Sequence, residues 1–169
     1  YIGASSMYAW QFMKMLGLQR ANGLAQFVSM QPHYNLVYRE EEREMLPLCL
    51  DQGVGVIPWS PLARGFLTRD PAESSARKET DEFGKTLYGT ADAGVIDAVA
   101  RIAAERGVPR AQIALAWVSK HPAVSAPIVG ATKPEHLTDA VASLDIRLTP
   151  DEIRELEAPY TPQPVQGHA

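Results

Sequence analysis

Small polar groups, a primary amide and a large aromatic ring follow the apolar runs of this sequence. Gln31 carries a primary amide that can satisfy both the donor and the acceptor of another amide, and the hydroxyls of Ser5 and Ser6 can add hydrogen bonds. Trp59 offers a flat π face on which another ring can stack. These residue types together indicate a binding site for a flat ring that bears an amide group.

A second set of residues could bind phosphate groups. Glycines allow the backbone to approach a ligand closely, helix N-termini attract anions, and basic side chains add positive charge. The candidates that combine these properties are Leu62, Arg64, Gly65, Gly130, Thr132 and Lys133. An amide, a flat ring and phosphates are the parts of a nicotinamide dinucleotide, and we expect such a ligand.

The elements that must position these residues are four short apolar runs, at residues 1–4, 27–31, 54–59 and 126–129, which alternate with helical patterns. This alternation predicts an α/β fold with a parallel sheet covered by helices. Four strands make about half of a (β/α)₈ TIM barrel, which typically takes ~250 residues. We therefore predict the C-terminal half of a barrel, as a single partial domain over residues 1–169. A doubly wound sheet is the rival, but the sequence has no G-x-G-x-x-G turn.

The helical patterns begin and end at recognisable residues. Ser5 and Ser6 can cap a first helix whose apolar stripe fades by Gly17. A second helix is expected from residue 39 to Gly53, with solvated glutamates at 40–44 and a kink at Pro47. Further helical patterns cover residues 95–102 and 109–118, and others begin near residue 134 and at a capping box in residues 149–152. The polar stretch 63–89 predicts a long loop over the cofactor site.

Composition narrows the class of protein. The formal net charge is −4, with 46% hydrophobic and 21% charged residues, as in ordinary soluble domains. The absence of a basic block argues against nucleic acid as a partner, and the apolar runs are too short for a membrane span. We predict a cytoplasmic protein in which Cys49 is a small buried hydrophobe. Because a chain terminus inside a strand is unusual, we expect Tyr1 to be an internal residue of a longer protein.

Several motifs resemble, in order, the second half of an aldo-keto reductase, from the fifth barrel strand onward. They are YIGASS, FVSMQPHYN, GVIPWSPLARGFLTR, AQIALAWV and IVGATKPEHL, followed by the closing YTP…GH. The resemblance implies a (β/α)₈ barrel that binds NADP(H) in an extended form without a Rossmann domain. It also implies that Ser5, Ser6 and Gln31 contact the nicotinamide carboxamide, and that Trp59 is the stacking aromatic.

The same resemblance implies roles for the rest of the cofactor site. Residues beside the pyrophosphate would be Ser60, Leu62, Arg64 and Gly65, and residues beside the adenosine 2′-phosphate would be Gly130, Thr132 and Lys133. His136 and Asp139 fall near the adenine, whereas Ala140 stands where the family commonly has asparagine.

The catalytic Asp, Tyr, Lys and His of the family come from the first four strands, which this chain does not contain. We expect the chain alone to have no reductase activity and poor affinity for the cofactor, because the proton donor is absent. His33 follows the sixth strand rather than the fourth, so we expect a surface or hydrogen-bonding role. Nothing near the phenols in sequence would lower their pKa; these are Tyr34, Tyr38, Tyr88 and Tyr160.

Three functional hypotheses follow. The first is an NADPH-dependent oxidoreductase that reduces small aldehydes or ketones to alcohols. The second is a cofactor-binding regulatory subunit that resembles the auxiliary subunits of potassium channels, and the third is an inactive truncation product. Because half a barrel leaves edge strands at residues 1–4 and 126–129, we also expect the fragment to associate with itself or with the missing N-terminal half.

Overall fold

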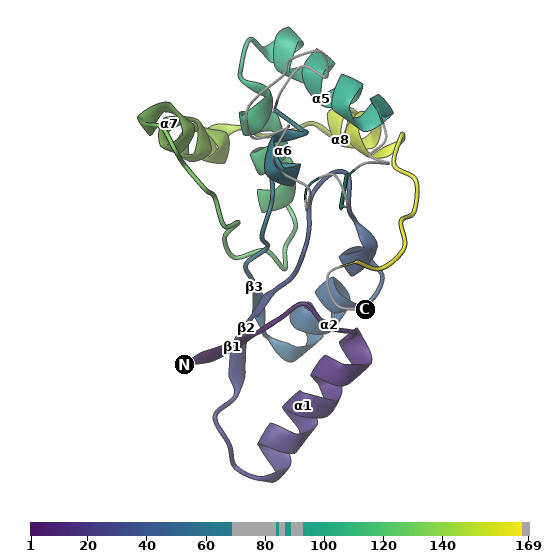
Figure 1. The fold of residues 1–169 in the computed structure, drawn as a ribbon, viewed down its shortest axis with the longest axis vertical. Helices are drawn as coiled ribbons and strands as arrows, with labels where there is room; N and C mark the ends of the chain where they lie inside the picture. Colours follow the sequence, from purple (N-terminus) through teal and green to yellow (C-terminus); the bar gives the residue numbers. More distant parts are fainter. Residues whose placement is uncertain (69–83, 85–86, 89–92, 167–169) are drawn as a thin grey trace.

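The structure of the chain is a computed structural model that describes residues 1–68, 84, 87–88 and 93–166. Three parallel strands lie side by side in chain order: β1 (Ile2–Ser5), β2 (Phe27–Gln31) and β3 (Gly55–Val56). Helix α1 (Ala9–Ala21) connects β1 to β2, and α2 (Met45–Gln52) connects β2 to β3. Figure 1 shows these two helices near the sheet, at the end of the molecule that contains the N-terminus. The βαβαβ order is that of an α/β fold.

Four further helices gather at the opposite end of the molecule (Figure 1): α5 (Ala93–Arg106), α6 (Arg110–Ser119), α7 (Pro134–Ala142) and α8 (Pro150–Glu157). Short 3₁₀ turns η1 (Glu40–Glu42), η2 (Ala63–Gly65) and η3 (Ser143–Asp145) complete the described elements. None of the described helices has the length and apolarity to cross a membrane. The predicted loop 63–89 lies largely outside the described residues.

The fourth predicted strand, residues 126–129, does not form among the described residues, so the prediction of four strands is wrong. The segment before it approaches β3 at one bridge, between Val56 and Val124. The Val56 N–H donates to the Ala123 carbonyl at 3.0 Å, and the Ser125 N–H donates to the Val56 carbonyl at 2.8 Å. Only one more such bond follows, at 2.9 Å from the Ile128 N–H to the Pro58 carbonyl. Pairing on one side over so few residues does not make a regular strand.

Two glycines lie where neighbouring segments approach closely. A Cβ atom on Gly3 would lie 2.3 Å from Ser29 Oγ, and one on Gly55 would lie 2.6 Å from Ser125 Oγ. A side chain at either position would therefore force the serine hydroxyl to move. At Gly3 the Ser29 carbonyl would also lie 3.2 Å from the added Cβ, so the fit between β1 and β2 is the tighter of the two.

Helix α1 begins and ends later than predicted. Its N-cap is Tyr8, whose backbone N–H donates to Gln11 Oε1 at 3.1 Å, so the prediction that Ser5 or Ser6 caps the helix is wrong. Gly17 does not end it, because one glycine inside a helix costs only about 1 kcal/mol relative to alanine. The helix ends at Ala21.

The acidic segment after β2 is a 3₁₀ turn rather than the start of a long helix. Helix α2 begins at Met45, which corrects the predicted start at residue 39. Pro47 then lies in the first turn, where its missing N–H costs no intrahelical bond, so the predicted kink is wrong. Gly53 ends the helix in the left-handed conformation, with φ 66°, as predicted.

The glutamates of this turn are not all solvated, which corrects another prediction. Glu40 and Glu41 are only 9% and 6% exposed. The Glu40 carboxylate accepts hydrogen bonds from the Tyr160 hydroxyl at 2.7 Å and from the Gln163 N–H at 2.9 Å, and it pairs with Arg43. The C-terminal segment therefore covers an acidic turn that lies about 120 residues earlier in the chain.

The core extends from the sheet into the four helices α5 to α8, which we call the upper helices. Phe12, Met30 and Val56 are fully buried beside the sheet, and Val99 of α5 and Trp117 of α6 are fully buried among the upper helices. Cys49 is buried, as predicted. The predicted capping box of α8 is confirmed, because the Thr149 N–H donates to Glu152 Oε2 at 2.6 Å and the Glu152 N–H donates to Thr149 Oγ1 at 3.2 Å.

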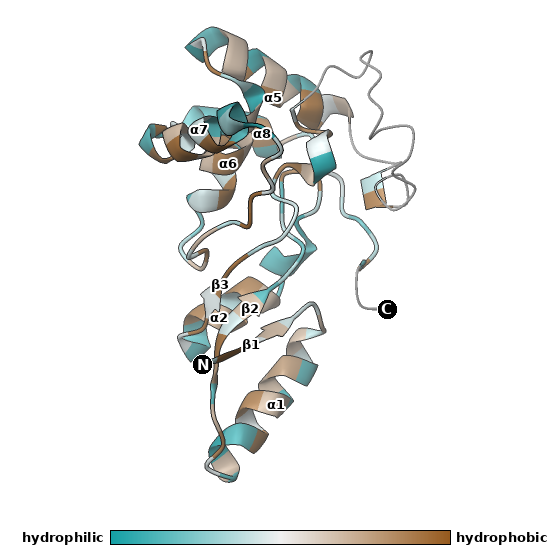
Figure 2. Ribbon diagram, turned by 60° about the vertical axis from the view of Figure 1, so that its left-hand side comes forward, coloured by the Kyte–Doolittle hydropathy of each residue, from teal (hydrophilic) through white to brown (hydrophobic). Residues whose placement is uncertain are grey.

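Helix α7 leaves an apolar stripe uncovered (Figure 2). None of its residues is buried, and Leu137 and Val141, four residues apart, are each 60% exposed. Leu144 follows on the same side of the chain at 58%. Exposed apolar surface of this kind favours association. Association with a second copy or with an N-terminal half stays a prediction.

Candidate functional site

The carboxyl ends of the first two strands and the segment after the third meet at one edge of the sheet. Ser5 is paired with Gln31 across β1 and β2, and the Ser5 hydroxyl donates to the Gln31 carbonyl at 3.2 Å. The indole Nε1–H of Trp59 donates to Ser6 Oγ at 3.3 Å. The structure therefore brings together the four residues that the resemblance assigned to the nicotinamide. Their role in binding stays a prediction.

The Trp59 ring stacks on a buried histidine. The ring centroids of His33 and Trp59 are 4.2 Å apart and their planes differ by 9°. A backbone bridge also joins these two residues. His33 is 0% exposed, so a surface role is wrong, whereas the expected hydrogen-bonding role is confirmed. Trp59 has no second aromatic partner among the described rings, so its other face has no ring contact there.

Polar contacts hold the edge of the His33 ring. Its Nε2 lies 2.5 Å from the Tyr88 hydroxyl and 3.2 Å from Asn35 Nδ2. Asn35 Nδ2 also donates to the Ser60 carbonyl at 3.0 Å. Burial lowers the pKa of His33 to about 3, so the imidazole is neutral at neutral pH. A neutral ring can accept a hydrogen bond at Nε2 and stack without the cost of a buried charge.

The loop after Trp59 contains an unusual run of left-handed backbone. Ser60, Ala63 and Arg64 have φ values of 52°, 48° and 54°, and Gly65 has 98°. Each left-handed residue other than glycine costs roughly 1–2 kcal/mol. Ala63, Arg64 and Gly65 are consecutive, and the Ala63 and Gly65 N–H groups donate to the Ser60 and Leu62 carbonyls within the loop, each at 2.9 Å. Strained backbone is concentrated at ligand-binding sites, so this loop stays the predicted pyrophosphate segment. Leu62, by contrast, packs partly buried against the core.

The second predicted phosphate segment lies at the start of α7. Lys133 is the N-cap residue of this helix, and the Thr132 N–H contacts His136 Nδ1 at 3.4 Å. Gly130, Thr132, Lys133 and His136 are exposed. Within the described part of the chain, no hydrogen bond or ion pair joins this segment to Ser5, Ser6, Gln31 or Trp59. The structure therefore shows two separate groups of predicted residues.

Asp139, which the resemblance placed near the adenine, has a partner within the fold. Its Oδ1 accepts a hydrogen bond from Gln112 Nε2 at 2.9 Å, which ties α7 to α6. A carboxylate that holds two helices together has a structural role whether or not it contacts a ligand. The adenine role of Asp139 and His136 stays a prediction.

The buried tyrosines are poor proton donors. Burial is the largest cause that raises the pKa of Tyr34 and Tyr160, and it raises the pKa of Tyr38 to about 12. The hydroxyls of Tyr34 and Tyr160 donate to Glu42 and Glu40, each at 2.7 Å, which also retains their protons. None of these three phenols is prepared to act as a general acid near neutral pH.

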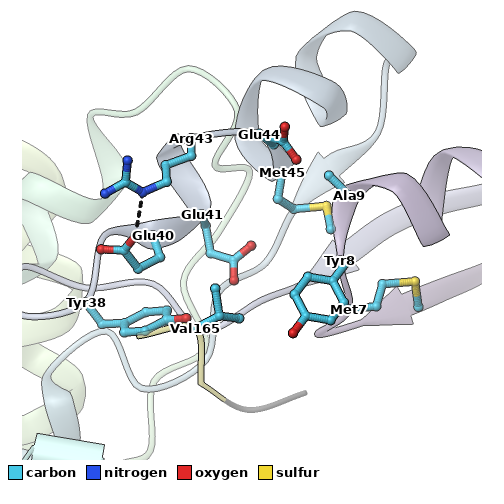
Figure 3. Close-up of a pocket in the computed structure, with 10 residues that line it drawn as sticks. All are labelled: Met7, Tyr8, Ala9, Tyr38, Glu40, Glu41, Arg43, Glu44, Met45 and Val165. Atoms are coloured by element: carbon cyan, nitrogen blue, oxygen red, sulfur yellow. Dashed lines mark hydrogen bonds and ion pairs between the residues drawn. The ribbon is translucent and has the colours of Figure 1, made fainter. Parts of the chain in front are cut away.

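A small cavity of about 130 Å³ lies beside Tyr38, between the start of α1 and the acidic turn η1 (Figure 3). Figure 3 shows the Glu41 carboxylate directed toward Tyr8 and Val165. Burial raises the pKa of Glu41 to about 7, and the nearby Glu40 charge adds to this. Ligand pockets usually measure ~300–1,000 Å³, so this cavity is too small for a dinucleotide.

The residues behind Trp59 were not predicted as part of the site from the sequence. Gln31, His33 and Asn35 recur every second position, and such spacing places side chains on one face of an extended segment. That signal could have indicated His33 and Asn35 as neighbours of the site. Nothing local indicates Tyr88, because its contact with His33 joins residues 55 positions apart.

Comparison with known proteins shows the family of this chain. A model of the aldo/keto reductase family matches residues 1–160. The chain is 45% identical to versiconal hemiacetal acetate reductase of Aspergillus parasiticus, over 98% of this chain and 49% of that protein. It is 44% identical to an aldo-keto reductase of Fusarium vanettenii, over 100% of this chain and 46% of that protein.

A protein of Schizosaccharomyces pombe that is provisionally named an aryl-alcohol dehydrogenase is 45% identical, over 99% of this chain and 48% of that protein. The chain therefore spans about half the length of the curated relatives it matches. The family model covers nearly the whole chain, and the relatives agree with it in name or in the carbonyl–alcohol chemistry that the name describes. The chain belongs to the aldo/keto reductase family.

Proposed function

We propose that this chain supplies the nicotinamide-binding part of an NADPH-dependent oxidoreductase that reduces aldehydes or ketones to alcohols. The observation that carries the proposal is the Trp59 ring, which stacks on His33, donates to Ser6 and lies beside the end of β2. Because one face of the Trp59 indole is fixed against His33, a nicotinamide can stack on its opposite face. Hydroxyl and amide groups beside it can bind the carboxamide.

The residues of the chain fit the other parts of the cofactor. The strained loop from Ser60 to Gly65 can approach the pyrophosphate closely at Gly65, and Arg64 adds positive charge to the same loop. Lys133, at the exposed start of α7, can pair with a 2′-phosphate, which is the group that distinguishes NADPH from NADH. When bound, the cofactor supplies a hydride to the carbonyl carbon of the substrate. Because the chain spans about half the length of its relatives, we place the proton donor in the part of the whole protein that this chain does not include.

The substrate class follows from the chemistry of the relatives. The name aryl-alcohol dehydrogenase, given provisionally to one relative, supports an aromatic aldehyde as the substrate of the whole protein. The location we propose is the cytoplasm. The test is NADPH oxidation by the natural full-length protein with 4-nitrobenzaldehyde, compared with NADH at the same concentration. A folded protein that binds NADPH but turns over no aldehyde or ketone would refute the reductase proposal.

Replacement of Trp59 by alanine should weaken NADPH binding roughly tenfold. Stacking of a base on an aromatic side chain is worth about 1–3 kcal/mol, and 1.4 kcal/mol is tenfold in affinity. Trp59→Tyr should retain most of the affinity because it keeps a flat ring. The measurement is titration of NADPH fluorescence with the full-length protein.

The matched control for this prediction is Trp10→Ala. Trp10 lies on α1 and is 63% exposed, so its loss removes an indole without touching the site. Equal affinities of the Trp59→Ala variant and the unmodified protein would contradict the stacking role.

A further inference from the structure

We infer that His33 is a positioning residue of the cofactor site. Its ring fixes the orientation of the Trp59 indole against which the nicotinamide stacks. Its hydrogen-bond partners also contact the loop that begins at Ser60. The inference rests on the proposed binding of a nicotinamide at Trp59. It concerns a residue that does not contact the cofactor and acts through its neighbours.

The His33 ring is stacked between two other aromatic rings. His33 lies 4.2 Å from Trp59 with planes at 9°, and 4.2 Å from Tyr38 with planes at 11°. Two nearly parallel rings at this distance cannot share one face of an imidazole, so His33 lies between them. Tyr38 is buried and its hydroxyl accepts the Gln166 N–H at 3.0 Å. The buried Tyr38 ring thus fixes the orientation of His33, and His33 in turn fixes that of the half-exposed Trp59 indole.

A network of hydrogen bonds surrounds the edge of the His33 ring. The Val37 N–H donates to Asn35 Oδ1 at 3.0 Å, which fixes the orientation of the amide. The Nδ2 of this amide then donates to the Tyr88 hydroxyl at 3.1 Å and to the Ser60 carbonyl at 3.0 Å, and it lies 3.2 Å from His33 Nε2. Ser60 is the first left-handed residue of the strained loop. One amide therefore holds both the supporting ring and the start of the predicted phosphate segment.

Packing in the core does not by itself explain why residue 33 is a histidine. His33 Nδ1 is buried and has no hydrogen-bond partner among the described residues. Leaving a buried polar atom unpaired costs stability, and a phenylalanine would stack without that cost. What phenylalanine could not do is hydrogen-bond the Tyr88 hydroxyl, which lies 2.5 Å from Nε2. An imidazole serves the stack and the network together, so packing alone does not account for it.

The test compares two ligands that differ only in the nicotinamide. NADP⁺ carries the ring, and 2′-phospho-ADP-ribose has the same adenosine and phosphates without it. The variants are His33→Leu, which removes the flat ring, and His33→Phe, which keeps the stack and loses the edge contacts. Tyr34→Phe is the control, because Tyr34 is an adjacent buried ring that hydrogen-bonds Glu42 and packs at a tilt against Trp117 rather than against Trp59. Affinities are measured by calorimetry with the natural full-length protein.

We expect His33→Leu to weaken NADP⁺ binding about threefold to tenfold while it changes the affinity for 2′-phospho-ADP-ribose less than about twofold, since loss of an aromatic stack costs affinity in that range. His33→Phe should lie between, and Tyr34→Phe should leave the ratio of the two affinities unchanged. Loss of both ligands in parallel would show a structural role only and overturn the inference. If the unmodified protein binds the two ligands equally, the proposed nicotinamide site itself is wrong. If it prefers NADP⁺ and His33→Leu keeps that preference, only the positioning role is wrong.

Discussion

Replacement of Trp117 by alanine is expected to lower the free energy of unfolding by about 3–5 kcal/mol, the usual range for a buried tryptophan. Trp117 in α6 is fully buried, and its ring contacts Tyr34 at a centroid distance of 5.2 Å. The Arg39 guanidinium and the Lys120 ammonium lie 5.4 and 5.2 Å from the ring centroid. The indole Nε1–H also donates to Glu157 at 2.9 Å. Alanine would leave a cavity, two cations without the ring and a carboxylate without one of its donors.

The measurement is urea unfolding followed by circular dichroism. We expect the midpoint to fall and the slope with denaturant to stay the same, because the change affects the folded core. Trp10→Ala is again the matched control, and it should change stability by less than about 0.5 kcal/mol, as exposed positions usually do. A loss below 1 kcal/mol for Trp117→Ala would contradict the assignment of this ring to the centre of the upper core.

Replacement of Arg39 by methionine is expected to cost about 2–3 kcal/mol. The Arg39 side chain is 15% exposed and donates to Glu42 at 2.7 Å and to Glu157 at 3.2 Å. Methionine keeps most of the length but leaves Glu42 and Glu157 without their shared cation, so that Lys120 remains as the ion-pair partner of Glu157. Removing one partner of a fully buried pair costs 3–5 kcal/mol, and the partial exposure of both glutamates reduces this.

The control for Arg39 is Arg154→Met. Arg154 pairs with Asp151 one turn away on α8, but its side chain is 71% exposed, so its loss should change the unfolding free energy very little. Equal effects of the two substitutions would contradict the special position of Arg39. Arg39 and Trp117 share Glu157, so their double variant should lose less than the sum of the single losses.

Local signals in the sequence predicted local features well. The left-handed end of α2 at Gly53 and the capping box at Thr149 depend on residues within one helical turn, so the pattern contains all the information needed. The parallel order of the first three strands follows from the alternation of apolar runs with helices. The burial of Glu40 could not be predicted, because it depends on Tyr160 and Gln163, which return from the far end of the chain.

In the candidate site, too, some residues could be predicted from the sequence and others could not. Gln31 and Trp59 stand at strand ends, where the pattern of residue types indicates binding, and the structure places them at one edge of the sheet. The support behind Trp59 depends on tertiary contacts of His33 with Tyr38 and Tyr88, and only the alternation around His33 hints at it. The failed fourth strand is a similar case, since an apolar run predicts a strand but does not determine how many residues find a partner.

The return of the C-terminal segment also bears on the order of events in folding. Tyr160 and Gln163 bind Glu40 across 120 and 123 residues, and Gln166 binds Tyr38 across 128. Closing so long a loop from an unfolded chain carries an entropic cost of about 4 kcal/mol, so we expect these contacts to form after the intervening helices have docked. Weakening contacts that form late speeds unfolding and leaves the folding rate nearly unchanged. We therefore expect substitutions in this segment to shorten the lifetime of the stack of Tyr38, His33 and Trp59 and to have little effect on how quickly it forms.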